Sequence, residues 1–323
     1  MKTLRRIIKL LLVMVIVIPI IAYFLTFKIS GVIHDKNIDT SSLTEYSHSH
    51  KDGIKNILIM GSDARPGDKV SRSDSLMIMS IDSIHDDVKI TSLARDTLVN
   101  IDDHGKSKLT HAYAFGKEKL LIKTVEDNFD IDIDDFVAID FKSFMAIIDA
   151  VGGVTVEVKD HDINELNKFI PETYSWDTRQ DKGDMQLVKS SGIQKLNGYQ
   201  ALSFARIRHN DSAFGRDNRQ RMILSSLMKE LKATSKFKYL SILKTAAPYI
   251  TTNMDTMKLI KYGLSIMTKD ISNIKQMEFP LVDNPKYTTS GIYGYKYKSK
   301  GLGKWLKDSL ISKWPRRVDR SCI

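Results

Sequence analysis

Two aspartates and two arginines in the first third of this chain have the chemistry of a metal-assisted phosphate site. They are Asp63, Arg72, Asp74 and Arg95, and each lies close to the end of an apolar run. Hard cations such as Mg²⁺ prefer carboxylate oxygens and commonly complete their shell with water and substrate phosphate. Guanidinium groups bind phosphate bidentately and stay charged. This set of residues suits the binding of a magnesium-bound pyrophosphate. The alternative is a sheet edge with structural salt bridges, in which Asp74 pairs with Arg95 and Asp63 with Arg65.

Two neighbouring apolar runs, 75–82 and 88–94, are predicted to form an antiparallel hairpin, because turn-forming residues separate them. A turn centred between positions 84 and 85 gives paired residues whose numbers add to 169. That register places Asp74 opposite Arg95. A carboxylate and a guanidinium are therefore expected at the open end of the hairpin.

An earlier strand is predicted to bring a second carboxylate to the same rim. Residues 56–60 form a short continuous apolar run ended by Gly61, which is typical of a buried strand. If this strand is antiparallel to the second, or parallel to the third, Asp63 reaches the rim. Arg72 lies two residues beyond Asp74 on that edge, beside Asp96.

Further cationic side chains come later in the chain. Arg206 and Arg208 stand two apart, so an extended segment would aim both at one face. Arg216, Arg219 and Gln220 lie in or near the first turn of a predicted helix. A helix start favours anions, so arginines there are unfavourable unless an anion is bound. Surface arginines on an ordinary helix are the alternative.

The remaining pattern predicts a mixed α/β fold, with a central, mainly antiparallel or mixed β-sheet flanked by helices. The stretch 160–192 is polar and is predicted to be an irregular loop. Helices are expected over 113–129, 141–151, 197–204, 217–232, 238–248 and 255–268, and further strands over 136–139 and 154–158.

The charge distribution argues against nucleic-acid binding. The chain carries 49 basic and 39 acidic residues, a net charge of +10. The excess is confined to residues 1–9, with four basic and no acidic residues, and 286–323, with ten basic and two acidic. The intervening part is slightly acidic and has no duplex-wide basic footprint. The basic tail could lie against anionic lipid or wall polymer, or be a solvated end.

An N-terminal hydrophobic segment indicates a membrane protein. Residues 10–27 carry no charge and as a helix would be about 27 Å long, near the thickness of a bilayer core. The basic residues before it predict a single-pass anchor with a cytoplasmic N-terminus, a linker over 28–55 and an extracellular body. A cleaved signal peptide is the alternative. The single cysteine, Cys322, excludes a disulfide framework.

Several motifs occur in an order that resembles the LytR–CpsA–Psr family of cell-wall polymer ligases. They are NILIMGSD (56–63), SRSD (71–74), LARD (93–96), KLTHAY (108–113), DAVGGV (149–154), LNG (196–198), RIR (206–208) and RQ (219–220). The match extends over about residues 56–232. The family's usual proline before Arg-Asp is Ala94 here, and its paired glycine is Gly116-Lys117, which affects loop geometry but no charged ligand.

This resemblance implies a Mg²⁺-dependent phosphotransferase of Gram-positive cell envelopes, with Mn²⁺ as an alternative ion. Its donor would be an anionic glycopolymer, of teichoic acid or capsule type, on a polyprenyl-pyrophosphate carrier in the membrane lipid. Its acceptor would be the 6-hydroxyl of N-acetylmuramic acid in peptidoglycan, and nucleic acid is not an expected partner. Residues 56–235 would form the catalytic domain, and 236–323 a C-terminal helical extension with a basic tail.

The resemblance also assigns roles to residues of this chain. Asp63 and Asp74 would bind the metal, and Arg95 would be catalytic. Because the hydroxyl nucleophile needs a proton acceptor, we expect Asp74 or Asp96 to take this role. The pyrophosphate would be bound by Arg72, Arg95, Arg206, Arg208 and Gln220, with Arg219 adjacent. The lipid would contact Phe141, Phe144, Ile148, Met222, Ile223 and Leu227, which could equally be ordinary core residues.

Three other functions remain open from the sequence. A membrane-bound hydrolase would cleave lipid pyrophosphates with water as the acceptor. A non-catalytic wall-polymer-binding or regulatory protein would need neither Asp63 nor Asp74. A DNA-binding attenuator would need its body in the cytoplasm, contrary to the predicted orientation.

Overall fold

The computed structural model of the chain describes residues 53–63, 72–180, 182–207, 213–246, 249–269, 274–279, 288–289 and 295–296. The predicted cytoplasmic segment, membrane anchor and linker lie outside these residues, as do Arg65, Arg208 and most of the basic tail. In the described part, no helix is both long and apolar enough to cross a bilayer.

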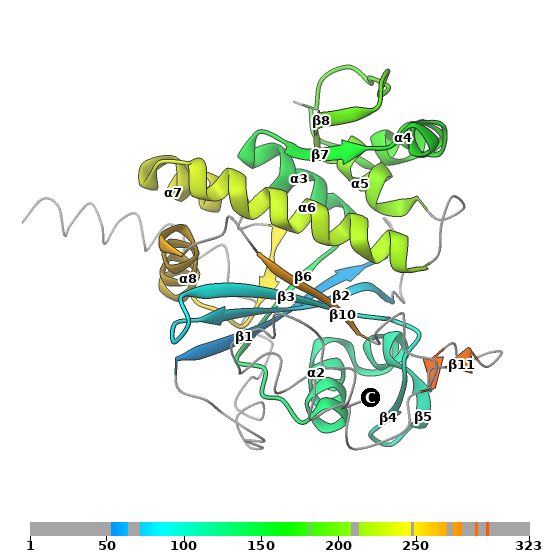
Figure 1. Cartoon of the computed structure of the whole chain (residues 1–323), viewed down its shortest axis with the longest axis vertical. Coiled ribbons are helices and arrows are strands. Elements are labelled where there is room, and N and C mark those ends of the chain that lie inside the picture. Colours follow the sequence, from blue (N-terminus) through cyan, green and yellow to red (C-terminus); the bar gives the residue numbers. More distant parts are fainter. Residues whose placement is uncertain are drawn as a thin grey trace, which may run out of the picture.

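A six-stranded mixed sheet forms the centre of the molecule (Figure 1). Its order is β10-β3-β2-β1-β6-β9. β1 is antiparallel to β2, as β2 is to β3, while the β1–β6 and β3–β10 pairs are parallel. The predicted mixed α/β class is confirmed. The strands are β1 (Ile54–Ser62), β2 (Ser73–Asp82), β3 (Asp87–Leu93), β6 (Asp135–Ile139), β9 (Thr251–Thr252) and β10 (Lys275–Phe279).

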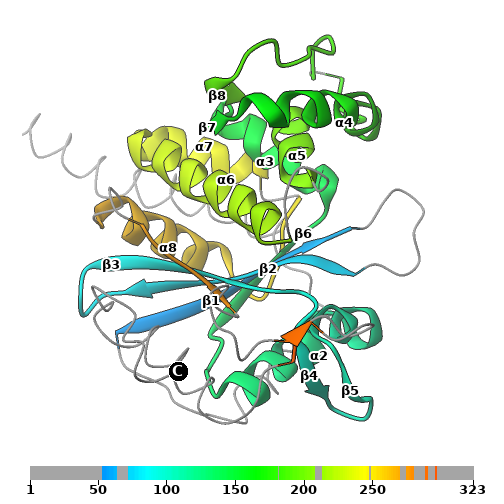
Figure 2. The same cartoon turned by 45° about the vertical axis from the view of Figure 1, so that its right-hand side comes forward.

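Helices cover both faces of this sheet (Figures 1 and 2). Alternation along β1 explains the two layers, because Leu58 and Met60 enter one apolar cluster and Ile57 enters the opposite one. On one face lie α2 (Leu109–Phe129), β4 (Leu98–Ile101) and β5 (Gly105–Lys108). On the other lie α3 (Phe141–Val151), α5 (Gly198–Arg206), α6 (Ala213–Ala233), α7 (Lys236–Ala246) and α8 (Thr256–Thr268).

A smaller layer sits beyond these helices. It consists of β7 (Val154–Val158), η2 (Asp160–Asp162), α4 (Ile163–Trp176) and β8 (Gly192–Leu196), with β7 and β8 antiparallel. Two short strands, β11 (Thr288–Thr289) and β12 (Tyr295–Lys296), form a separate pair.

The predicted hairpin register is confirmed. Met77 pairs with Ser92 and Asp82 with Asp87, so every pair adds to the predicted value. The turn occupies the four residues between β2 and β3, and Asp86 takes the left-handed conformation there, with φ of 53°. Asx residues tolerate this conformation better than most others, which fits a tight turn.

The expectation of an irregular loop over 160–192 is wrong for its first half, where η2 and α4 form. Leu166 and Ile170, four residues apart, are fully buried, and the Thr173 hydroxyl bonds the Ser203 hydroxyl of α5 at 2.7 Å. Pro171 lies inside this helix, where it removes a backbone donor. Packing of this face against α5 outweighs that local cost.

The C-terminal part is more than a helical extension. It contains α7 and α8 as predicted, but β9 pairs with β6 and β10 pairs with β3. The Ala94 amide also donates to the Phe279 carbonyl at 2.8 Å, directly before Arg95. Residues after 235 therefore complete the central sheet and hold the strand end that carries Arg95.

Candidate functional site

The open end of the β2–β3 hairpin carries an ion pair. Continuing the register past Met77 and Ser92 puts Asp74 opposite Arg95, and Arg95 Nη1 donates to Asp74 Oδ1. Both side chains remain partly accessible, with 19% of Asp74 and 24% of Arg95 exposed. The predicted juxtaposition is confirmed, and the pair can still reach a ligand.

A second carboxylate reaches this rim from β1. The Asp63 amide donates to the Arg72 carbonyl at 3.0 Å, and the Arg72 amide donates to Asp63 Oδ1 at 2.7 Å. A register irregularity at Gly61–Ser62 ends the β1–β2 ladder immediately before these contacts. Because β1 is antiparallel to β2, Asp63 and Asp74 come to the same edge, as the sequence predicts.

This edge opens into a cavity of about 700 Å³ between the sheet and the helices above it. Its charged lining includes Asp63, Arg72, Asp74, Arg95, Asp140, Arg206 and Arg216. Farther along the strands the lining is apolar: Ile59 of β1 pairs with Met77 of β2 and Val137 of β6, and all three face the cavity. The cavity therefore joins a charged rim to an apolar chamber.

Most of the predicted lipid-contact residues line this chamber. Phe141, Phe144, Ile148, Ile223 and Leu227 do so, whereas Met222 packs at the edge of an apolar cluster and does not. Other lining residues were not predicted, because a continuous apolar run does not reveal which strand face meets the helices. They are Ile59, Met77, Val137, Ile139, Ile147, Phe169, Leu202, Ala205, Leu224 and Ile250.

Arg206 lies among aromatic rings on the wall of the cavity. Its guanidinium is 4.5 Å from the Trp176 ring centroid and 4.8 Å from that of Phe169, and its Nη1 lies 2.9 Å from Glu172 Oε2. These partners belong to α4, which the sequence reading missed. The predicted extended backbone at Arg206 is also wrong, because the capping box of Asn197 begins α5 and this helix continues to Arg206.

The arginines of α6 divide into two kinds. Arg216 lines the cavity and is bonded through Nη2 to Asp217 Oδ1 at 3.0 Å, and Gln220, one turn later, also lines it. Arg219 is buried, donates to the Ile207 carbonyl at 2.7 Å and does not line the cavity. α6 begins four residues earlier than predicted, which moves Arg219 into the second turn.

Asp96 follows Arg95 in the sequence but is not part of the cavity lining. It accepts a hydrogen bond from Lys108 at 2.7 Å and lies 3.7 Å from the Arg95 guanidinium. Burial favours its neutral form, but the Lys108 hydrogen bond and the nearby positive charges outweigh burial and lower the pKa of Asp96. It does not line the cavity as Asp74 does, although Arg95 contacts both carboxylates.

Two buried acid–base pairs, Arg216 with Asp217 and Arg221 with Glu278, lie on the α6 side of the rim. Burial raises the pKa of Asp217 despite its contact with Arg216. Arg221 bonds Glu278 of β10 at 3.1 Å, and burial raises the pKa of that carboxyl to about 7. The Arg221–Glu278 pair therefore links α6 to β10, the strand next to β3.

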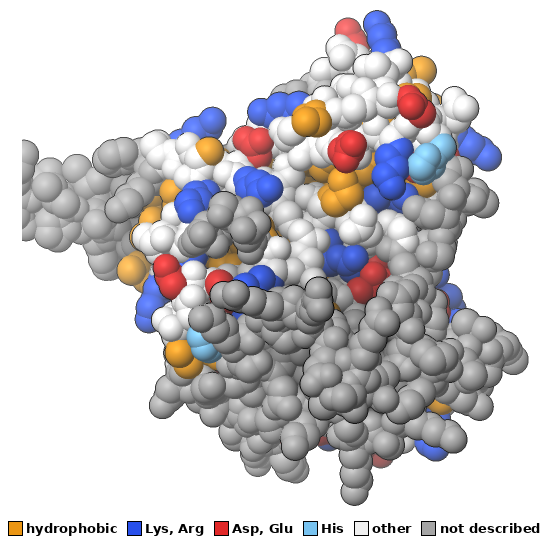
Figure 3. All heavy atoms as spheres, viewed as in Figure 1, with side chains coloured by type: hydrophobic (Ala, Val, Ile, Leu, Met, Phe, Trp, Pro, Cys, Tyr) orange, Lys and Arg blue, Asp and Glu red, His pale blue; other side chains and the backbone are white. Residues whose placement is uncertain are grey.

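Charges of both signs are interspersed on the described part of the face shown in Figure 3. Within the described residues, no group of three or more His, Cys, Asp or Glu side chains is arranged to hold a metal ion.

The fold and the cavity define a mixed α/β protein whose site suits an anionic headgroup attached to an apolar chain. The sequence profile of the LytR_cpsA_psr family matches residues 21–309, and this chain belongs to that family. The resemblance noted in the sequence motifs is confirmed.

Named relatives include both transferases and regulators. Polyisoprenyl-teichoic acid–peptidoglycan teichoic acid transferase TagU of Oceanobacillus iheyensis is 32% identical over 275 residues, covering 82% of this chain and 78% of TagU. Regulatory protein MsrR of Staphylococcus aureus is 30% identical over 234 residues, covering 71% of this chain and 65% of MsrR. The structure of TagT bound to LI-WTA matches with a TM-score of 0.64 and 25% identity, over 83% of this chain and 94% of that one.

Proposed function

We propose that this protein transfers an anionic glycopolymer, of teichoic acid or capsule type, from a polyprenyl-pyrophosphate carrier to peptidoglycan. The product would be a phosphodiester on the 6-hydroxyl of N-acetylmuramic acid. The observation that carries the proposal is that four arginines and two rim aspartates open onto an apolar chamber within one cavity. The transferase TagU and the ligand-bound TagT support it, since both are relatives of this chain.

The two halves of the cavity match the two halves of such a donor. Arg72, Arg95 and Arg216 supply guanidiniums for bidentate phosphate contacts. The apolar side chains from the sheet, α3 and α6 offer a dry surface to an isoprenoid chain, whose burial contributes about 25 cal/mol per Å². Neither half alone would select a lipid pyrophosphate over a plain lipid or a free phosphate.

The rim also suits a resident Mg²⁺. Asp63 and Asp74 are the residues that would hold it, and both line the cavity. Magnesium in enzymes is usually bound by one or two carboxylates together with substrate phosphates and water, so two aspartates are sufficient. When bound, the ion would neutralise negative charge on the pyrophosphate oxygens.

The chemical step is a displacement at phosphorus. The acceptor hydroxyl oxygen forms a bond to the phosphorus nearest the polymer, and the bond from that phosphorus to the bridging oxygen breaks. The electron pair leaves with polyprenyl phosphate, where Arg95 and its neighbours stabilise the developing charge. Of the predicted proton acceptors, Asp74 lines the cavity and Asp96 does not, which favours Asp74.

The membrane placement is part of this proposal. The uncharged segment 10–27 would anchor the chain with its N-terminus in the cytoplasm and the cavity outside the cell. Proteolysis of intact protoplasts tests it: cleavage beyond residue 28 by an external protease is expected, and full protection would contradict it.

The transfer itself is tested with the full-length protein in detergent, purified lipid-linked polymer and peptidoglycan fragments. The expected product is polymer joined to the glycan, together with released polyprenyl phosphate. Free polymer alone would identify a hydrolase instead. Absence of both products, with retained function in cells when Asp63 and Asp74 are both changed to Ala, would identify the regulatory role suggested by the name MsrR.

A further inference from the structure

An exposed aromatic stack lies on the face of the sheet opposite the apolar chamber. The Phe115 and His104 rings are stacked, with centroids 4.4 Å apart and an interplanar angle of 10°. The His111 ring centroid lies 5.9 Å from that of Phe115. Phe115 is 48% exposed, so part of its ring remains accessible to a ligand.

A helix interruption directly follows Phe115 and sets its position. Gly116 and Lys117 leave the helical conformation inside α2, and Lys117 has φ of 52° and ψ of −147°. A side chain is rarely found in this region, and such strain costs on the order of 1–3 kcal/mol. A Cβ on Gly116 would come within 2.5 Å of the Leu120 Cβ, so the interruption also requires glycine. Gly116 therefore permits this bend, whereas Lys117 adopts it at a cost.

The start of α2 is bonded to the strand ends that carry the rim. The Thr110 amide donates to the Arg95 carbonyl at 3.0 Å, and its hydroxyl donates to the Ser73 carbonyl at 2.8 Å. Phe115 follows Thr110 by five residues, about 7.5 Å along the helix. The aromatic stack is thus held at a fixed and short distance from the residues next to Arg72, Asp74 and Arg95.

We propose that His104, His111 and Phe115 form a platform that binds the glycan strand of the acceptor beside the donor cavity. The inference rests on the proposed transferase function and gives the acceptor a location. An apolar face of a pyranose ring can pack on an exposed aromatic ring, as other flat apolar groups do. We assign the platform to the acceptor glycan because the cavity already holds the donor through its lipid and its pyrophosphate.

The direction of the reaction supports this placement. The attacking and leaving oxygens lie roughly in line at phosphorus. The leaving polyprenyl phosphate is directed into the apolar chamber, so the acceptor hydroxyl must approach from the rim. The platform lies at that side, joined to it through Thr110.

The polar surroundings fit a muramic-acid glycan. The His111 imidazole bonds the Ser107 hydroxyl through Nδ1 at 2.8 Å. Burial and the charges of Arg72 and Lys108 lower its pKa, so the neutral ring can exchange a hydrogen bond with a sugar hydroxyl. Lys106 and Lys117 are exposed nearby and can attract the carboxylate of a muramic acid lactyl group.

The test is isothermal titration of the full-length protein with a soluble glycan of alternating N-acetylglucosamine and N-acetylmuramic acid, without lipid. Phe115→Ala is expected to weaken binding about threefold to tenfold, the loss of one aromatic contact. Phe115→Tyr keeps the ring and should bind like the wild type. Ile193→Ala, at a remote side chain that is 78% exposed, is the matched control and should have no effect.

Binding of a polyprenyl pyrophosphate by the same variants separates the two substrates. The platform predicts no change in donor affinity for Phe115→Ala and, in the transfer assay, a raised KM for acceptor alone. Equal glycan binding by wild type and Phe115→Ala, or no binding by the wild type, would overturn it. Weaker donor binding would assign the stack to the donor instead. If the glycan binds through Phe115 but no transfer occurs, the platform stands and the transferase proposal fails.

Discussion

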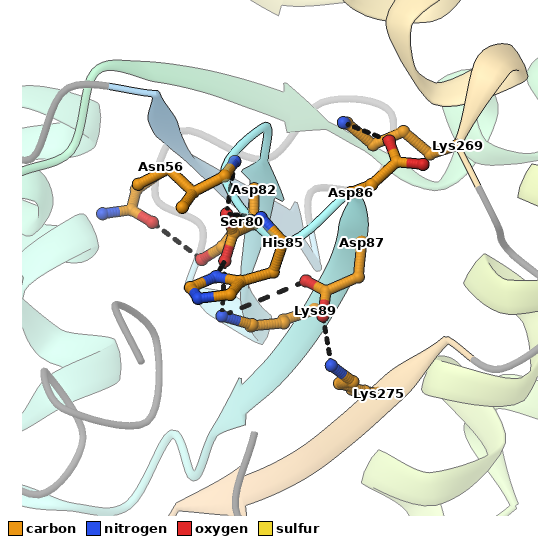
Figure 4. Close-up of polar contacts among 10 residues, drawn as sticks. Asn56, Ser80, Asp82, His85, Asp86, Asp87, Lys89, Lys269 and Lys275 are labelled. Carbon is orange, nitrogen blue, oxygen red and sulfur yellow. Dashed lines mark hydrogen bonds and ion pairs between the residues drawn. The ribbon is translucent and has the colours of Figure 1, made fainter. Parts of the chain in front are cut away.

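The two ends of the β2–β3 hairpin both carry aspartates paired with cations, yet they are built differently. At the closed end, Lys89 Nζ bonds Asp82 Oδ2 at 2.8 Å, and neither side chain has any exposed surface (Figure 4). Lys269 pairs with Asp86 and Lys275 with Asp87, so three lysines face three aspartates. At the open end, Asp74 and Arg95 are partly exposed and face a cavity.

This difference distinguishes charged side chains that stabilise the fold from charged side chains that are available to bind a ligand. Enclosed charges are stable only when each has a partner, as the fully buried Asp82 and Lys89 of the closed end do. The cavity instead has four arginines against Asp63, Asp74 and Asp140 in its lining, and Asp140 also caps α3. Arg206 and Arg216 also pair with Glu172 and Asp217, while the rim pair Asp74–Arg95 keeps the partly exposed surface that an anionic headgroup would contact. Five substitutions test whether structural and ligand-binding charges have these separate roles.

The largest effect is expected at the open end. Arg95→Ala should lower polymer transfer by about 10²–10³-fold, because a preorganised donor to the developing charge is lost. Its free energy of unfolding should change little, since the side chain is partly exposed. Transfer rates with purified substrates and urea denaturation measure the two quantities. Transfer near the wild-type rate would remove Arg95 from the mechanism.

The opposite pattern is expected at the closed end. Lys89→Met leaves Asp82 and Asp87 without their shared buried cation and should destabilise the fold by about 3–5 kcal/mol. Transfer per folded molecule should stay at the wild-type value. Urea denaturation, followed by activity measurements below the transition, checks both points. A loss of transfer in a fully folded variant would mean that the two ends are coupled.

A smaller contrast is predicted between neighbouring arginines of α6. Arg219→Ala should destabilise by about 1–3 kcal/mol, because the Ile207 carbonyl and the buried Asp162 lose a partner. Arg216→Ala should instead weaken lipid pyrophosphate binding about tenfold, as expected for one charged hydrogen-bond donor. Thermal unfolding and lipid binding of both variants give the comparison, and the reverse outcome would restore the role first predicted for Arg219.

The smallest effect concerns pH. Burial raises the pKa of Glu278 from 4.5 to about 7. The folded protein therefore binds this proton more tightly than the unfolded chain, and stability should fall as pH rises from about 4.5 through 7. Glu278→Gln removes the titrating carboxyl and should flatten this part of the profile. Asp82 has the opposite behaviour, since hydrogen bonds from Lys89 and His85 overcome burial and lower its pKa to about 2.

Denaturation at several pH values measures this difference. The Asp82 contribution is present above pH 4 and is lost as pH falls toward 2. An unchanged slope between pH 5 and 8 in Glu278→Gln would show that Glu278 does not titrate in this range.

The local sequence pattern is sufficient to predict which residues meet at the rim. The register follows from the position of one turn, and it places Asp74 against Arg95 without any information on distant contacts. Strand direction then brings Asp63 to the same edge. These are short-range consequences of strand geometry, and the structure confirms them.

The features that the sequence does not predict depend on packing between distant parts of the chain. β10 joins β3 from nearly two hundred residues away, and no local pattern specifies that partner. α4 forms despite Pro171 because its buried face packs on α5, and with it come the aromatic neighbours of Arg206. Which arginine of α6 faces the cavity depends on the rotation of that helix against the sheet.

The central claim is that the cavity recognises an apolar chain and its pyrophosphate together. The most direct measurement is the affinity of the full-length protein for a polyprenyl pyrophosphate and for the polyprenol of the same length, in detergent with Mg²⁺. The account predicts at least a hundredfold preference for the pyrophosphate, which Arg95→Ala reduces by tenfold or more. Equal affinity for the two lipids, or a preference unaffected by Arg95→Ala, would contradict it.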